Sequence, residues 1–308
     1  MSWSDGKAYV DDLGAGLFAY IQPPGGWQVN NCGFIVGPAG HCVLVDSSST
    51  ERRTRSFLAE VDRRSADPPV ALVNTHHHPD HTYGNFLVPE QTPVLGHVRC
   101  REKVLKAGLE AMRVITEPDY GDIQLRPPEI TFSDRVTLYV DDQPLELQPV
   151  GPAHTNNDVL VWVAEQRCLF AGDIAFAGGQ PFFLEGTLAG YRAVIDVVRA
   201  YEPDILVSGH GPVCRGDEVP SLLDVLAGYA DMIAAIAQEA VSEGLTPLEA
   251  AQRHRQHEYS HLQEPERLVG NLHRACAELR GDEDDAQLTV RTVWSDMEAF
   301  VGPIHSHA

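Results

Sequence analysis

One short segment carries four imidazoles and a carboxylate, and it directly follows an apolar run, Val70 to Asn74, that predicts a buried strand. The segment is Thr75-His76-His77-His78-Pro79-Asp80-His81. Open α/β sheets place their functional sites at the carboxyl ends of strands, which is where this segment lies. Because so many polar groups would repel one another or stay unsatisfied in a core, the segment predicts a metal site.

The alternation of side chains along an extended segment assigns roles within this group. His76 and His78 face the same side and can share one cation, whereas Asp80 and His81 lie on the following turn and can reach a second. His77 then points away from the cations. Supporting a ligand from behind, or packing, explains His77 better than direct coordination does. Two metals need more ligands than this segment supplies.

Three further candidate ligands stand at the ends of predicted strands, each near a glycine: His154, Asp173 and His210. Any one of them alone could equally be structural. The imidazole-rich set favours zinc, although mixed nitrogen and oxygen sites also accept iron or manganese.

Composition limits the class of protein. The 308 residues suffice for one main α/β domain with a helical appendage, and a net charge of -21 argues against a nucleic-acid partner. Six scattered cysteines, without a CxxC pair, predict reduced thiols. Residues 1–6 lack the pattern of a secretory signal, and no apolar run reaches the roughly 20 residues of a membrane span, so a cytoplasmic protein is expected.

Short strands and helices alternate through the first two thirds of the chain, which predicts a layered α/β fold. Expected strands are 33–36 and 42–45 as a hairpin, then 70–74, 136–140, 145–150, 159–163, 168–171 and 205–208; expected helices are 51–64, 98–112 and 188–201. After a boundary near 217–221 the chain becomes helical, with a capping box at Thr246-Pro247-Leu248-Glu249. The domains are therefore 1–218, catalytic, and 219–308, a helical extension packed on it. The acidic run 282–285 is expected to be a solvated loop.

The ordered set His76-x-His78-x-Asp80-His81, His154, Asp173 and His210 resembles the metallo-β-lactamase superfamily over about residues 15 to 215. The resemblance implies that His76, His78 and His154 hold one metal, that Asp80, His81 and His210 hold the other, and that Asp173 bridges them. Asp46 would support the ligand loop through hydrogen bonds. The implied fold is an αββα sandwich of two mixed sheets packed face to face, with helices outside and the metals at one edge.

An aspartate at position 173 favours thioesterases and lactonases of that superfamily over true β-lactamases, which generally have a cysteine or serine near that place. Two divalent cations can share a water and lower its pKa toward neutrality, which supplies hydroxide at pH 7. Asp80 is the expected catalytic residue, because it can orient that nucleophile and then pass a proton to the leaving group.

Four other segments are similar to the actinorhodin-type second-ring cyclases of bacterial aromatic polyketide pathways: 24–27, 123–132, 151–155 and 266–274. This resemblance runs almost from end to end. It implies a substrate held as a thioester on an acyl carrier protein, with aldol ring closure, hydrolytic release, or both. Trp27, Phe182 and Phe183 are expected to line an apolar substrate pocket.

Alternatives remain open. An acidic carrier protein would be repelled by this acidic chain unless a basic patch exists, and Arg99, Arg101, Lys103 and Lys106 form a candidate patch. A general thioesterase or lactone hydrolase would need no patch, and a non-catalytic scaffold is the third class. Arg267 and Arg274 are expected to be solvated helix charges, with contact to a phosphopantetheine phosphate as the alternative. A homo-oligomer is open as well.

Overall fold

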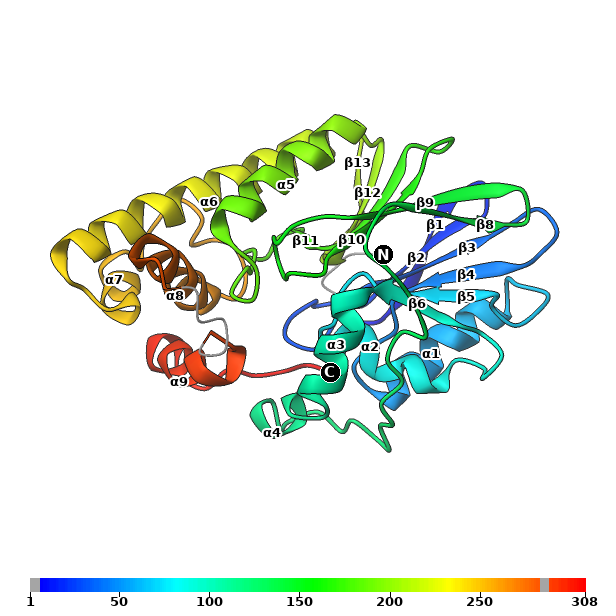
Figure 1. The fold of residues 1–308 in the computed structure, drawn as a ribbon, viewed down its shortest axis with the longest axis horizontal. Helices are drawn as coiled ribbons and strands as arrows, with labels where there is room; N and C mark the ends of the chain where they lie inside the picture. Colours follow the sequence, from blue (N-terminus) through cyan, green and yellow to red (C-terminus); the bar gives the residue numbers. More distant parts are fainter. Residues whose placement is uncertain (1–5, 283–287) are drawn as a thin grey trace.

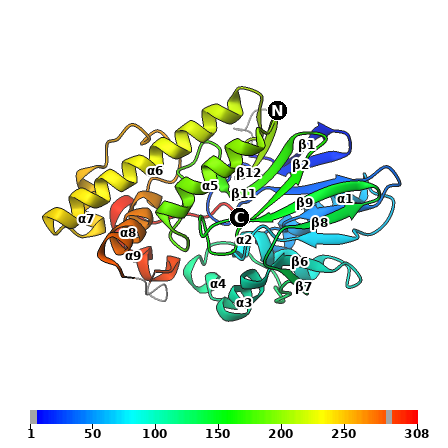
Figure 2. The same ribbon diagram turned by 45° about the horizontal axis from the view of Figure 1, so that its top comes forward.

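The computed structural model describes residues 6–282 and 288–308. Residues 1–5 and 283–287 lie outside the described residues, so the absence of a signal pattern and most of the acidic run are not addressed by the structure. Within the described part, the strands form two sheets that pack face to face, with helices on both outer sides (Figures 1 and 2). The expected αββα sandwich with additional C-terminal helices is confirmed.

The first sheet is antiparallel at its start and parallel at its end. Its strands run in chain order: β1 (Tyr9–Gly14), β2 (Leu17–Ile21), β3 (Cys32–Val36), β4 (Cys42–Val45), β5 (Ala71–Val73), β6 (Val94–His97) and β7 (Ile130–Phe132). The predicted hairpin is β3 and β4, with Gly33 opposite Val45 and Val36 opposite Cys42. From β4 to β7 each strand is parallel to the next. The helices α1 (Glu51–Asp62) and α3 (Val98–Ala107) connect these parallel strands.

The second sheet is built from the later strands. Its order is β13 (Cys214–Arg215), β12 (Ile205–His210), β11 (Cys168–Phe176), β10 (Val159–Val163), β9 (Gln143–Pro149) and β8 (Val136–Val140). The pair β11 and β12 is parallel, because α5 (Leu188–Tyr201) carries the chain back between them. Every residue of β11 is buried, as expected for a strand covered on both faces.

One core lies between the two sheets and follows the alternation of side chains along each strand. On β4, Val43 and Val45 point into this core and meet Val161 and Phe170 of the second sheet. Leu44 points to the other face, toward Phe57 of α1. All six cysteines are buried and unpaired, which agrees with the expectation of reduced thiols.

The prediction of a single helix over 98–112 is wrong. The structure ends α3 at Ala107 and starts the short α4 at Ala111 (Ala111–Val114). Gly108 between them has a positive φ of 56°, which ends the helical path and which glycine adopts without a Cβ penalty.

In the described part of the chain, the second sheet is followed by the helices α6 (Glu218–Glu243), α7 (Pro247–Arg253), α8 (Arg267–Arg280) and α9 (Val290–Val301). Figure 1 shows α6 and α8 beside α5, with α7 beyond them at the end of the molecule. The predicted capping box at Thr246 is confirmed. By length and composition alone α6 could span a membrane, but its apolar stripe, which includes Tyr229 and Ile233, is fully buried in the core that it shares with α5 and α8.

Candidate metal centre

The histidine-rich segment leaves β5, in the middle of the first sheet, and folds back into the short helix α2 (Pro79–Thr82). Pro79 occupies the first helical position, where a missing N–H costs nothing. Asn74 fixes the return of the chain, because its Nδ2 donates to the backbone oxygen of His81 at 2.9 Å. This hydrogen bond closes the loop on itself.

The second sheet brings the other candidate ligands to the same edge. His154 lies in the turn after β9, which Asp158 orders by accepting hydrogen bonds from the backbone N and the Oγ1 of Thr155. Asp173 is in β11, and His210 is the last residue of β12. Gly209 lets these two strands meet closely, since a Cβ there would stand 1.9 Å from Asp173 Oδ1.

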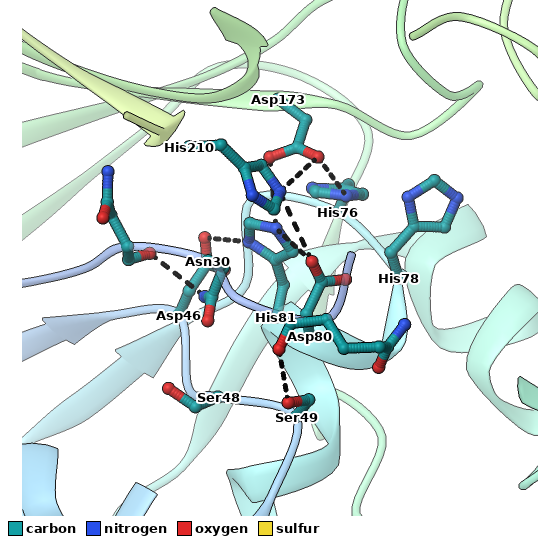
Figure 3. A network of polar contacts seen from close by, with 12 residues as sticks. Asn30, Asp46, Ser48, Ser49, His76, His78, Asp80, His81, Asp173 and His210 are labelled. Atoms are coloured by element: carbon teal, nitrogen blue, oxygen red, sulfur yellow. Dashed lines mark hydrogen bonds and ion pairs between the residues drawn. The ribbon is translucent and has the colours of Figure 1, made fainter. Parts of the chain in front are cut away.

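The seven candidates form two clusters that touch each other. Figure 3 shows His76, His78, Asp80, His81, Asp173 and His210 together. In each cluster the ligand atoms lie within 4.8 Å of one another; one cluster is His76, His78, His154 and Asp173, and the other is Asp80, His81 and His210. Asp173 reaches both clusters, with Oδ2 at 3.4 Å from His154 Nε2 and Oδ1 at 3.1 Å from His81 Nε2. The structure thus brings together the residues of both ligand sets that the resemblance implies, with Asp173 grouped with His76, His78 and His154.

The donor atoms fit metal ions. Among the described residues, Nε2 of His76 and Nε2 of His78 are buried without a hydrogen-bond partner. Nε2 of His81 and Oδ1 of Asp173 also lack a hydrogen bond, although they face each other as an ion pair at 3.1 Å. Leaving such groups unpaired in a protein interior costs about 1–3 kcal/mol each, more for charged groups. A cation between them would satisfy them together, with imidazole and carboxylate donors that suit zinc and its neighbours.

The two clusters differ in charge. Burial lowers the pKa of His76 and His78, and it lowers that of His154 to about 4, so these imidazoles are neutral at pH 7 with lone pairs available. Burial opposes protonation of His210 as well, but Asp173 and Asp80 raise its pKa to about 9. The proton on His210 thus offsets the negative charge of the buried carboxylates. A bound divalent cation would replace that proton as the source of positive charge.

Asp46 lies behind this centre and orients His81. Its Oδ2 accepts from His81 Nδ1 at 2.8 Å and from Thr75 Oγ1 at 2.7 Å, while its Oδ1 accepts from the backbone N of Thr75 at 2.7 Å. The φ of Asp46 is 62°, a left-handed conformation that aspartate and asparagine tolerate better than other non-glycine residues. With Nδ1 so engaged, His81 directs Nε2 toward Asp173 and Asp80.

Asp46→Asn is expected to weaken metal binding about 10- to 100-fold, the usual effect of removing the outer partner of a ligand. Asparagine keeps the left-handed backbone but presents an amide N–H to donors. Competition with a chromophoric chelator measures the affinity. The control is Asp141→Asn, a carboxylate that pairs with His41 outside the centre. Equal affinities for Asp46→Asn and the wild-type protein would contradict an orienting role.

The sequence missed two neighbours of His77. Its Nδ1 contacts Asn157 Nδ2 at 3.0 Å, and its Nε2 is 3.2 Å from Glu185 Oε2. Glu185 also lies 3.6 Å from Lys103 Nζ. His77 therefore has its own partners outside the seven-residue centre. No local pattern pointed to Glu185, which comes from the loop between β11 and α5.

A cavity of about 440 Å³ opens over the centre. Asp80, His154, Asp173 and His210 line its floor. Apolar groups from distant segments form its walls: Trp27, Val104, Val114, Ile115, Phe176 and Phe182. Lys103, Lys106 and Arg291 also border it.

Two expectations about this region are wrong. Phe183 does not line the cavity; its side chain is fully buried, with its ring centroid 5.1 Å from that of Tyr191. Arg267 and Arg274 are not solvated, because each is only 3% exposed. Arg267 lies over the faces of Trp27 and Phe176, with its Cζ 5.2 and 4.5 Å from the ring centroids. Sequence position alone did not reveal that the tail folds over the site.

Comparisons with known proteins agree with this geometry. A linear primary-alkylsulfatase from a Pseudomonas species is 25% identical over 71% of this chain and 48% of its own length. A hydroxyacylglutathione hydrolase from a Synechococcus species is 31% identical over 42% of this chain and 44% of its own length. The chain thus spans about half the length of these curated relatives.

Solved structures show the same fold. A sec-alkylsulfatase from a Pseudomonas species superposes with a TM-score of 0.69 at 18% identity, over 96% of this chain and 55% of that one. A metallo-β-lactamase from Pontibacter korlensis gives 0.60 at 19% identity, over 73% and 99%. The sequence profile of the metallo-β-lactamase superfamily matches residues 25–210, from the loop before β3 to the last candidate ligand. The chain belongs to the metallo-β-lactamase superfamily.

Proposed function

We propose that this protein is a dinuclear metal-dependent hydrolase and cyclase that acts on an aromatic polyketide thioester held by an acyl carrier protein. The observation that carries this proposal is the cavity of about 440 Å³ above the two clusters. Ligand pockets of about 300–1,000 Å³ with mostly apolar walls and few polar groups accept drug-sized molecules. Trp27, Phe176 and Phe182 contribute aromatic carbon atoms to the walls, which suits fused rings better than a short acyl chain.

Bound divalent cations would supply Lewis acidity to polarise the substrate carbonyl and acidify a water. The chain supplies the proton-handling group. Burial alone would raise the pKa of Asp80, but His81 and His210 lower it to about 2, so the carboxylate is ionised at pH 7. Because it lines the cavity floor, Asp80 can accept a hydrogen bond from the attacking water and carry its proton to the leaving group.

The acyl carrier as partner is supported by the cations that border the cavity. Lys103 and Lys106 of α3 and Arg291 of α9 lie there, although the chain as a whole is acidic. Of the basic patch expected from the sequence, Arg101 instead donates to the backbone oxygen of Pro128. Lys103 and Arg291 pair there with Glu185 and Glu110, so these cations offset the acidic groups at the mouth. Less repulsion at this place would help an anionic phosphopantetheine arm or an acidic carrier to approach despite the net charge.

The competing function is a general thioesterase or lactone hydrolase. It is supported by the 31% identity to a hydroxyacylglutathione hydrolase over 42% of this chain. The same centre would serve both reactions, since each begins with a carbonyl on a Lewis acid. The two functions differ in the acyl group that the walls accept.

The test is an incubation of zinc-loaded protein with a carrier-bound aromatic polyketide mimic and, separately, with an acetyl thioester, a hydroxyacylglutathione and a primary alkyl sulfate. Mass spectrometry follows the products. Release of a cyclised acid from the carrier-bound mimic, with slow turnover of the others, is expected. Turnover of the small thioesters alone would favour the general hydrolase, and no metal-dependent turnover would favour a non-catalytic scaffold.

Phe182→Leu and Phe183→Leu form a matched pair for the pocket. Phe182 lines the cavity and meets Trp27 edge to face, whereas Phe183 is core. An aromatic contact is worth about 0.5–1.5 kcal/mol, so Phe182→Leu should lower kcat/KM for the aromatic thioester by up to about 10-fold and leave acetyl thioester turnover unchanged. Phe183→Leu should lower only the melting temperature. Equal effects on both substrates would contradict ring recognition by Phe182.

A further inference from the structure

One face of α8 is polar and buried, which is unusual for a helix in the core of an appendage. Arg267, Asn271 and Arg274 are spaced by four and three residues, so they lie on the same side of the helix. Their exposed fractions are 3%, 0% and 3%. Buried polar side chains persist where they satisfy other buried polar groups.

The groups that they satisfy belong to the loop of residues 177–187, between β11 and α5. Arg267 Nη1 donates to the backbone oxygen of Gln180 at 2.8 Å. Asn271 Nδ2 donates to the oxygen of Pro181 at 2.8 Å, and Arg274 Nε donates to the oxygen of Leu184 at 2.7 Å. The face of α8 thus follows the loop residue by residue.

Asn271 makes a second contact that fixes the direction of the loop. Its Oδ1 accepts from the backbone N of Phe183 at 3.0 Å, so one amide side chain holds a donor and an acceptor of the loop. Tyr229 of α6 adds a hydrogen bond to Gln180 Oε1 at 2.8 Å. Because the loop forms no helix there, its backbone groups lack the hydrogen-bond partners that regular secondary structure provides. The C-terminal helices supply those partners instead.

The same loop supplies outer contacts to the first cluster. The backbone oxygen of Phe182 accepts from His154 Nδ1 at 2.5 Å, which leaves the Nε2 lone pair of His154 facing His78 and Asp173. Three positions later, Glu185 contacts His77, the neighbour of His78. A displacement of the loop would therefore turn His154 away from its cluster.

We infer that Arg267, Asn271 and Arg274 are positioning residues, which hold the loop 177–187 so that His154 completes the divalent-cation site of His76, His78, His154 and Asp173. The inference rests on the metal centre of the proposed function and adds to it a role for the C-terminal helices. It predicts a selective effect on the two clusters. The loop meets the cluster of Asp80, His81 and His210 at its first residue, where Ala177 N donates to the backbone oxygen of His210 at 2.9 Å. The residues that α8 holds come later, at 180–184, so the affinity of this second cluster should be spared.

The test is Zn²⁺ binding by competition with a chromophoric chelator. Asn271→Ala should weaken one of two bound zinc ions about 10- to 100-fold, the range for loss of an outer partner of a ligand. The same change should have no effect on the remaining zinc in a His154→Ala background, where the first cluster is already incomplete. In a His210→Ala background it should still weaken binding. Hydrogen exchange should show faster exchange of the amides in 177–187.

His273→Ala is the matched control, because His273 is on the same helix but contacts Asp296 of α9 at 2.8 Å. Its zinc affinities should equal those of the wild-type protein. Should Asn271→Ala not fold, Arg267→Lys retains the charge beside Glu264 while shortening the donor to Gln180, and it should give the same selective loss. Two unchanged zinc affinities in Asn271→Ala, or equal losses at both sites, would overturn this inference alone. A wild-type protein that binds no zinc would overturn the proposed function together with it.

Discussion

Asp173→Ala is expected to lower the rate of hydrolysis at least about 100-fold, because removing even the outer partners of metal ligands costs 10- to 100-fold and Asp173 lies among the ligands themselves. Its Oδ2 is 3.3 Å from His210 Nε2 and 3.4 Å from His154 Nε2, so both clusters lose a shared carboxylate. The measurement is kcat/KM together with the number of zinc ions bound per chain, which should fall below two.

Asp204→Ala is the control for this change. Asp204 immediately precedes β12 and so, like Asp173, lies near the parallel pair of β11 and β12. Its side chain, however, is 66% exposed and pairs with Arg167 on the surface. Surface ion pairs of this kind contribute little to stability, so activity and zinc content should stay at wild-type values. Full zinc occupancy in Asp173→Ala would show that the carboxylate does not join the clusters.

Gly209→Ala is expected to damage the centre without changing any candidate ligand. The added methyl would stand 1.9 Å from Asp173 Oδ1 and 2.8 Å from the carbonyl carbon of Gly172, so the carboxylate must move or the strands must separate. Overpacking of this kind costs about 1–3 kcal/mol. We expect a lower melting temperature, reduced zinc binding and loss of most activity.

The matched control is Gly179→Ala. The nearest heavy atom to a Cβ at Gly179 is Arg267 Nη1 at 3.8 Å, an ordinary contact distance. Thermal unfolding and zinc titration of the two variants separate the general cost of an added methyl from the specific clash. Zinc affinities in Gly209→Ala that match those of Gly179→Ala would mean that Asp173 can leave its position without harm to the centre.

The sequence predicted the parts of the fold that have a strong local pattern. The hairpin of β3 and β4 and the helix α5 were expected from apolar runs and turn residues, and both are present. The strand β1 was missed because Asp11 and Asp12 interrupt it and much of it is only partly buried. β6 was missed because it is short and contains Gly96, and glycine weakens a strand pattern.

The candidate ligands were predictable because each follows an apolar strand in the chain. What surrounds them was not, because those contacts join residues distant in sequence. Glu185 meets His77, and Asn271 meets Phe183 across 88 positions, and neither pair leaves a local pattern. The expected strand 168–171 was also too short: β11 continues to Phe176, with shifts in its register against β12 around Gly172.

The candidate ligands are divided between the two sheets. His76, His78, Asp80 and His81 follow a strand of the first sheet, whereas His154, Asp173 and His210 belong to the second. Neither half of the chain carries a full set, so a nascent chain that has built only the first sheet cannot retain the ions tightly. Ion uptake then reports that both halves have docked, and each bound ion ties the halves together by adding its binding free energy to the stability of the finished fold.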